Sequence, residues 1–286
     1  MRNWRILLAA AIAIYTALAV GAVNYVHVVD LTQDRAAARL RAQASLIAPH
    51  LEAAYHALRA DALTISRMPP FQGLARTLLQ NRPDPRDGST AKQWRQRLET
   101  IFHSVMAQRP DYAQLRYIGL ADGGREIVRV DRIGGTVRST PVDRLQRKGN
   151  RPYFTDSLTL ADGEVHISEI SFNHDHGKIY EDLPVIRAVT PVYGPRGNLF
   201  GLMVINAHAG EFFRSVLARM KTDGEIAIVT NAGDFITRSR HGEASQLYIQ
   251  GADAQSAPPL VRILHRSAPS DQTTSQHFNM QDYAVH

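Results

Sequence analysis

Cysteine is absent from this chain of 286 residues. Disulfide bonds, thiolate metal sites and cysteine nucleophiles are therefore excluded. A run of about five to eight lysines and arginines, which is typical of nucleic-acid binding, is also missing. Lysine and arginine outnumber aspartate and glutamate by only 33 to 27, and they are dispersed. We therefore predict no nucleic-acid partner, whereas the small positive excess favours anionic ligands or phospholipid headgroups.

Enzyme motifs are equally scarce. Ser168 and Ser171 do not stand in a Gly-x-Ser-x-Gly sequence, and the glycine pairs are spaced for hairpins because none leads from a strand into a helix. The segment 173–177, "NHDHG", offers two histidines and an aspartate, but a divalent metal would need a further ligand from elsewhere. A polar turn is the favoured interpretation of that segment. We predict no catalytic residue, no cofactor and no metal site.

One long apolar run stands near the N-terminus. No Asp, Glu, Lys or Arg occurs from Ile6 to Val29, and the run follows Arg2 and Arg5. At about 1.5 Å per residue, a helix of this length crosses the roughly 30 Å hydrocarbon core of a bilayer. The arginines favour a cytoplasmic N-terminus. We predict a transmembrane helix or signal anchor over 1–29, as a single span, and an exported remainder from about Asp30.

The same run allows a second interpretation as a cleavable signal peptide. Ala17 to Ala19 and the pair Gly21-Ala22 are small residues that a signal peptidase accepts. Against this interpretation, the run exceeds the ~7–15 residues of an ordinary signal core. Both interpretations export the rest of the chain, and cleavage would release a secreted periplasmic protein.

Residues 30–110 have the pattern of an extracytoplasmic helical region. We expect Pro49 to kink or restart the long helix, because proline lacks an amide proton. Shorter helices are predicted over 71–79 and 93–107, with a loop at 81–90. The apolar stripe of the long helix is typical of a core or of a dimer seam. The stripe has helical spacings of three and four: Leu40, Ala44, Ile47, Leu51, Tyr55, Leu58, Ala62 and Ile65.

From Tyr112 the pattern changes to β-strands. The runs Leu115–Leu120 and Glu126–Asp131 are separated by Asp122-Gly123-Gly124, where glycine tolerates the positive φ of a tight turn. Three more strands follow in "GEVHISEISFN" and "LPVIRAVTPVYGPRGNLFGLMVIN". Five strands in hairpin order predict an antiparallel sheet. The predicted fold class is therefore α+β, with this sheet domain at 111–221.

The sheet pattern then begins a second time. The stretch "GEIAIVTNAGDFITRS" predicts a hairpin around 231–234. A short strand is predicted at 260–264, within a tail rich in Ser, Gln, Pro and Ala. We expect the second unit, 222–286, to be smaller than the first and short of strands, so that it is a partial unit. We infer that the chain is a fragment or a truncated gene product.

A membrane helix, a long exported helix and a sheet closed by "VIRAVTPVYGPRGNLFGLMVIN" resemble the double Cache family of bacterial receptors, whose sensors are extracytoplasmic tandem PAS-like domains. The resemblance is strongest over Tyr112–Met220 and looser from Asp30 to about Leu264. "LRYIG…G.E.VRV.R" and "LQ.K..R.YF" are similar to the branch that precedes histidine kinase or diguanylate cyclase outputs. This resemblance implies a membrane-distal, ligand-binding Cache domain at 111–221 and a partial membrane-proximal one at 222–286. It also implies a bacterial inner membrane with a periplasmic sensor region, and a homodimer that signals through the long N-terminal helix.

The resemblance also implies a ligand site. In Cache domains that bind amino acids, an arginine followed after one residue by two aromatics grips the carboxylate, and an acidic residue ending the last sheet strand grips the amine. Arg151, Tyr153 and Phe154 match the first element. Asn206 stands where the motif has aspartate, and Gln146 stands near the place of an upstream tyrosine. A carboxylate or another anion is therefore better supported than an α-amino acid.

The residue types themselves support an anion site. Arginine presents a planar fork that matches a carboxylate, and the two aromatics supply apolar walls. Lys148 adds a positive charge. Asp131, at the end of a strand, would neutralise Arg151 or balance a zwitterionic ligand. Alternatively, Arg151 pairs with Asp131 or Glu169 while the aromatics belong to the core. The candidate ligand-binding set is Arg151, Tyr153, Phe154, Lys148, Asp131 and Asn206.

These observations favour a sensor that is not itself an enzyme. We predict the extracytoplasmic sensing module of a bacterial transmembrane receptor, whose histidine kinase or diguanylate cyclase output is absent from this chain. Its predicted partners are a small, carboxylate-bearing molecule, the inner membrane and a second copy of the chain. Two alternatives remain open, a secreted periplasmic hydrolase and a dimerisation module that binds nothing.

Overall fold

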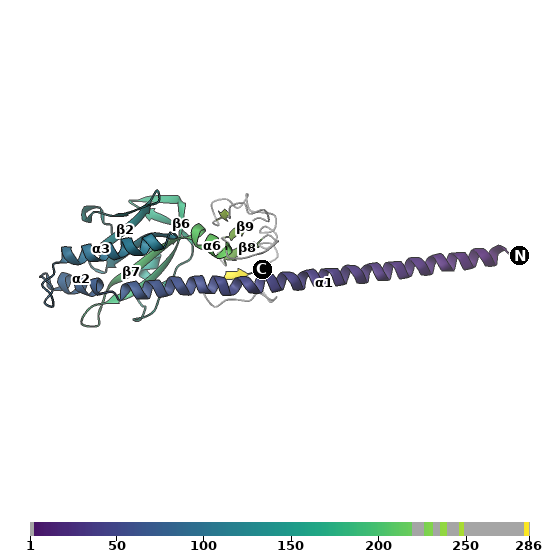
Figure 1. Cartoon of the computed structure of the whole chain (residues 1–286), viewed down its shortest axis with the longest axis horizontal. Helices are drawn as coiled ribbons and strands as arrows, with labels where there is room; N and C mark the ends of the chain where they lie inside the picture. The colour runs from purple at the N-terminus through teal and green to yellow at the C-terminus, as the bar shows by residue number, and fades with distance from the viewer. Residues whose placement is uncertain (1–2, 219–225, 231–234, 239–245, 249–282, 286) are drawn as a thin grey trace. The chain divides into compact units, whose positions relative to one another are not determined.

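The computed structural model describes residues 3–218, 226–230, 235–238, 246–248 and 283–285. The chain divides into two compact units, Met1–Ile47 and Ala48–Val285. The first unit is part of one long helix, and the second combines helices with antiparallel sheets (Figure 1).

Helix α1, Asn3–Ser66, begins in the first unit and ends in the second. Its segment Ala11–Thr32, of 22 residues and mean hydropathy 1.7, is by length and composition able to cross a membrane. The helix continues through Pro49, so the predicted restart at this proline is wrong. Because proline has no amide proton, the carbonyl of Ser45 loses its helical partner. Pro49 and Ser45 are both exposed, so water can reach this carbonyl.

The C-terminal part of α1 contributes to the core of the second unit. The ring of Tyr55 lies 5.0 Å from that of Phe212, measured between centroids. This half of the predicted apolar stripe is therefore used within one chain. Its buried members are Leu51, Tyr55, Leu58, Ala62 and Ile65.

Helices α2, Pro69–Gln80, and α3, Ala91–Gln108, lie beside the sheet, in agreement with the helices predicted there (Figure 1). Thr90 begins α3 with a capping box that includes Gln93. The loop between the helices is fixed by a buried ion pair of 2.6 Å between Arg76 and Asp84. This arrangement presents the apolar sides of both helices to the sheet.

The main sheet is antiparallel throughout, which confirms the predicted fold class. Its strand order is β3-β2-β1-β7-β6-β4, and β5 also pairs with β6. The predicted hairpins are present, and the short strands at the edges extend the sheet beyond the five that were expected. The strands are β1 Tyr112–Gly119, β2 Glu126–Ile133, β3 Thr136–Ser139, β4 His166–Ile167, β5 Ser171–Asp175, β6 Lys178–Tyr193 and β7 Leu199–His208.

Short helical turns connect these strands, and a second sheet follows. The turns are α4 Ala121–Gly124, η1 Val142–Arg144 and α5 Pro152–Thr155, and helix α6 spans Ala209–Leu217. The second sheet has the order β10-β9-β8-β11, from β8 Ile226–Thr230, β9 Phe235–Arg238, β10 Gln246–Tyr248 and β11 Tyr283–Val285. The predicted turn at 231–234 and strand at 260–264 lie outside the described residues.

The two faces of the main sheet differ in chemistry. Tyr117 faces the helices, since its ring lies 4.6 Å from that of Phe71 in α2. Side chains alternate along a strand, so Gln114 and Arg116 of β1 lie on the opposite face. The connecting segment 140–177 contributes Tyr153 to that same face, where its hydroxyl meets Arg116. Polar residues are thus buried between the sheet and this segment.

Candidate functional site

Strand pairing places a group of buried polar residues on one sheet face. Gln114 of β1 lies opposite Asn206 of β7, and Asn206 lies opposite Arg187 of β6. Arg116 lies opposite Arg129 of β2. Each of these five residues is at most 5% exposed. We refer to them, together with the charged and aromatic side chains that contact them, as the sheet-face cluster.

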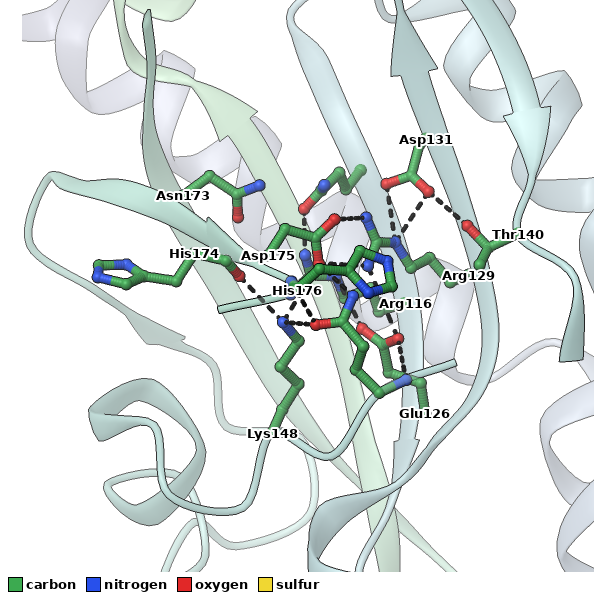
Figure 2. Close-up of polar contacts among 12 residues, drawn as sticks. Arg116, Glu126, Arg129, Asp131, Thr140, Lys148, Asn173, His174, Asp175 and His176 are labelled. Atoms are coloured by element: carbon green, nitrogen blue, oxygen red, sulfur yellow. Dashed lines mark hydrogen bonds and ion pairs between the residues drawn. The ribbon is translucent and has the colours of Figure 1, made fainter. Parts of the chain in front are cut away.

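Arg129 lies between two carboxylates (Figure 2). Its Nε donates to both oxygens of Asp131, at 2.9 and 2.8 Å, and its terminal nitrogens donate to both oxygens of Asp175. Burial alone would raise the pKa of Asp175, but the hydrogen bonds and charge of Arg129 hold it well below the usual range. Asp131 therefore neutralises Arg129, and its predicted pairing with Arg151 is wrong.

Lys148 is buried beside this ion pair. Its Nζ donates to Gln146 Oε1 at 2.9 Å and to the carbonyl of His174 at 3.0 Å, and it lies 3.4 Å from Asp175 Oδ1 (Figure 2). Burial, with the nearby charge of Arg116, lowers the pKa of Lys148 to about 8. Lys148 thus joins the "LQRKGNRPYF" segment to the turn that ends β5.

The "NHDHG" segment forms that turn between β5 and β6. His176 and Gly177 have φ values of 47° and 76°, and the backbone amide of His176 donates to Gln146 Oε1 at 3.0 Å. Asp175 is engaged with Arg129. In the described part of the chain, no group of three or more His, Asp or Glu side chains is placed to hold a metal ion.

Arg116 connects the cluster to the connecting segment. Its Nη1 donates to Tyr153 Oη at 3.3 Å, its Nη2 donates to Gln114 Oε1, and its Nε lies 3.3 Å from Glu126 Oε1. Asn206 Nδ2 also donates to Gln114 Oε1, at 2.7 Å. The buried Oδ1 of Asn206 receives no hydrogen bond from any described residue, so an acceptor remains available there.

Arg187 is a buried cation without a carboxylate partner among the described residues. Its terminal nitrogens donate to Ser171 Oγ at 2.5 Å and to the carbonyl of Phe172 at 3.4 Å, while its buried Nε has no acceptor there. Its Cζ lies 4.9 Å from the centre of the Tyr153 ring. Burial, with the charge of Arg116, lowers the pKa of Arg187 to about 10. The side chain therefore stays charged at neutral pH in a site where an unpaired charge is costly.

The structure brings most of the predicted site residues together. Tyr153, Lys148, Asp131 and Asn206 all belong to the sheet-face cluster. Arg151 begins the turn α5 and is half-buried, and no ion pair joins it to another described residue. Its positive charge nonetheless repels that of Arg187 and helps to lower the pKa of Arg187. Phe154 lies in an apolar group next to the cluster, with Ile118, Tyr153, Val189, Leu202 and Val204.

Sequence reasoning missed three central residues, Arg116, Arg129 and Arg187. Each is a cation with an apolar or aromatic residue on either side, in "LRYIG", "IVRVD" and "PVIRAVT". Charged residues are rarely fully buried unless they are paired or functional, so these positions carried a usable signal. The cluster contains four cations and three carboxylates, a net excess of one positive charge: Arg116, Arg129, Lys148, Arg187, Glu126, Asp131 and Asp175.

Two cavities lie apart from Arg187 and Asn206. One, of about 420 Å³, is lined in part by Gly123, Arg147 and Phe154. The other, of about 400 Å³, is lined mainly by apolar side chains from α2, β2 and β7. Neither is lined by Arg187 or Asn206. Arg187 and Asn206 are themselves buried, at 5% and 0% exposed.

Residues 88–252, more than half of the chain, match the family model described as the sensor domain of bacterial histidine kinases. The chain belongs to this family. Its fold is similar to that of a domain of a sensory box/GGDEF family protein from Vibrio parahaemolyticus, with 18% identity, a TM-score of 0.55 and 69% of each chain covered. It is also similar to the extracellular domain of a protein described as a histidine kinase, vpHK1S-Z8, with 19% identity, a TM-score of 0.51 and coverage of 70% of this chain and 69% of that one. No curated protein matches the chain.

Membership of this family confirms the predicted resemblance to the sensor domains of bacterial receptors. It also confirms a sensor function at the level of the domain. The fold is that of a sensor and not of a catalytic domain. Ser171, one of the two serines considered for a hydrolase, accepts a hydrogen bond from Arg187. Together with the apolar segment of α1, the family indicates a membrane-anchored receptor.

Proposed function

We propose that this chain senses a small carboxylate for a bacterial receptor with a histidine kinase or diguanylate cyclase output, and that the ligand binds at the sheet-face cluster. One observation carries the proposal: Arg187 is buried and charged, and no carboxylate of the described residues compensates it. A ligand carboxylate would supply the missing charge through two parallel hydrogen bonds.

The neighbours of Arg187 suit such a ligand. The ring of Tyr153 lies against the guanidinium and would form one wall of the site. Asn206, opposite Arg187 in the sheet, has a free buried acceptor that fits a hydroxyl or ammonium of the ligand. Arg151 and Phe154 precede and follow Tyr153 at the edge of the site. Lys148 and Asp131 have partners within the protein, so in this proposal they hold the cluster in place.

Binding requires the cluster to open, because Arg187 and Asn206 are buried. The segment 140–177 covers this face, and it must move for a ligand to reach Arg187. A ligand that favours the open arrangement over the closed one shifts the equilibrium between them by its difference in affinity. That shift is the step we propose for the signal.

A thermal-shift panel on the full chain in lipid nanodiscs tests the proposal. The probes are lactate, succinate and alanine, each compared with the amide in which its carboxylate is replaced. Because the proposed site provides an uncompensated cation, we expect at least one carboxylate to raise the melting temperature in a saturable manner and its amide to have no effect. The carboxylate site would be contradicted if no carboxylate tested raised the melting temperature, or if acid and amide raised it equally.

Arg151 has a test of its own. In this proposal its charge adds to the attraction at the edge of the site, so Arg151→Ala should weaken binding of the active carboxylate several-fold. Arg138→Ala is the matched control, because Arg138 is exposed on the edge strand β3. Unchanged affinity in Arg151→Ala would remove this residue from the site.

We further propose the organisation inferred from the sequence. Residues 1–29 anchor the chain as a single span of the inner membrane, 30–110 form the helical region, 111–221 the membrane-distal ligand-binding domain, and 222–286 a partial membrane-proximal one. Intact-mass measurement of the protein in the membrane fraction tests the anchor. Retention of Arg2 and Arg5 supports it, whereas a shorter, soluble product would indicate cleavage and release.

A further inference from the structure

The cavity of about 400 Å³ lies apart from Arg187, where α2, α3, the β1–β2 turn, η1 and the start of β7 meet. Its volume is in the range of small-molecule sites, roughly 300–1,000 Å³. Much of its wall is apolar, as in such sites generally. The apolar lining includes Leu78, Leu120, Ile127, Leu145, Leu199 and Phe200.

Two acidic residues of the lining already have partners. The carboxylate of Glu126 lies 3.3 Å from Arg116 Nε and accepts a hydrogen bond of 2.9 Å from the backbone amide of Gln146. The carboxylate of Asp122 accepts from Arg147 at 2.7 Å. Each acid therefore has a closer partner than either arginine of the lining.

Those arginines, Arg95 and Arg125, are poorly compensated. The Nε of Arg95 is buried and has no hydrogen-bond partner among the described residues, and no ion pair with Arg95 occurs among them. Arg125 makes only a distant ion pair, of 3.8 Å, with Asp122. Burial lowers the pKa of Arg95, the charge of Glu99 opposes this, and the charge of Arg125 adds to it. Two cations thus lie near each other at an apolar cavity.

We propose that this cavity is a second ligand site, which takes a small carboxylate with an apolar body, such as a medium-chain fatty acid or an aryl-alkyl acid. The carboxylate accepts hydrogen bonds from Arg95 and relieves its repulsion with Arg125. The apolar body packs between the leucines and Phe200. A purely polar acid gains little there, because it leaves the apolar wall in contact with water.

The second site shares one residue with the sheet-face cluster. Glu126 lines the cavity, and its carboxylate holds Arg116 in the cluster. A ligand in the cavity is therefore placed to change the affinity of the cluster for its own ligand, and the effect would be reciprocal. The existence of the second site does not depend on the carboxylate site at Arg187.

Calorimetric titration of the full chain in nanodiscs tests the proposal with octanoate and 3-phenylpropanoate as probes, and with their amides as neutral controls. Two variants address the cavity. Arg95→Gln removes the buried cation, and Leu78→Trp fills the apolar space. Lys92→Gln is the matched control, because Lys92 is an exposed cation on the same helix. Arg187→Met reports on the sheet-face cluster.

We expect saturable binding of the acids, a loss of about tenfold or more in Arg95→Gln and in the amides, and loss of binding in Leu78→Trp. Lys92→Gln and Arg187→Met should keep the affinity of the parent chain. The melting temperature of each variant shows whether it is folded. Absence of binding to the parent chain would overturn the proposal, and so would binding that Arg95→Gln and Leu78→Trp leave intact. Binding lost only in Arg187→Met would assign the acids to the sheet-face cluster instead.

Discussion

Two arginines on the same sheet face, Arg129 and Arg187, differ in what surrounds them. Arg129 is bracketed by Asp131 and Asp175, so its charge is balanced within the protein. Arg187 has a hydroxyl, a carbonyl and the ring of Tyr153 around it. A buried charge with this little compensation lowers the stability of the closed protein. Such a cost is understandable if a ligand supplies the missing partner.

Asp175→Asn tests the structural role of the balanced pair. Removing one member of a buried ion pair leaves the other charge uncompensated, at a cost of about 3–5 kcal/mol. We expect a loss of that size in the free energy of unfolding, measured with urea. Asp122→Asn is the control, because its pair with Arg147 is exposed at the surface, and it should cost about 1 kcal/mol or less.

The same pair makes stability depend on pH. The pKa of Asp175 is lowered in the folded protein from the ordinary value of 3.8. Its contribution is therefore complete above that value and is lost as the pH falls below it toward the lower folded pKa. We expect the difference between the parent chain and Asp175→Asn to shrink steadily below about pH 4. A difference that stays constant down to pH 2 would show that the charge of Asp175 is not responsible.

At the scale of elements, local patterns predicted the sheet well and the burial of its charges poorly. The glycines at 123, 124 and 197 adopt the positive φ that the hairpin predictions required. One of the two carboxylates that pair with Arg129, by contrast, is that of Asp175, 46 residues away in a turn that was interpreted only as polar. Strand alternation gives two faces but does not say which face a helix covers. Arg187 therefore could not be assigned to the site before the pairing of β6 with β7 was known.

The contact between α2 and α3 depends on Gly73. A Cβ at this position would lie 2.3 Å from Cε2 of Trp94. We expect Gly73→Ala to lower the free energy of unfolding by about 1–3 kcal/mol through overpacking. Trp94→Phe replaces the indole by a smaller ring and relieves part of this crowding, so the double variant should lose less than the sum of the two single changes. Strict additivity would mean that the two residues do not limit the approach of these helices.

At the scale of the whole molecule, α1 links a candidate membrane segment to the sensor domain. Its stripe from Leu51 to Ile65 is used in the core of one chain. The proposed dimer seam must therefore lie before Ala48, where the sequence stripe continues through Leu40, Ala44 and Ile47.

Single-cysteine cross-linking tests this seam without interference, because the chain has no native cysteine. We expect Ala44→Cys to form a covalent dimer under mild oxidation in membranes, since the stripe would bring two copies together. Ala42→Cys, on the other side of the helix, should cross-link more slowly. Equal rates at both positions, or no dimer at either, would argue against the seam.

The central claim is that Arg187 is held for a ligand. Calorimetric titration of the parent chain and Arg187→Met with the carboxylate that is active in the thermal-shift panel tests it most directly, together with the melting temperatures of both ligand-free proteins. We predict that Arg187→Met loses at least about tenfold in affinity while its melting temperature stays equal or rises, because an uncompensated buried charge is removed. An affinity equal to that of the parent chain, or a large fall in melting temperature, would mean that Arg187 serves the fold and not the ligand.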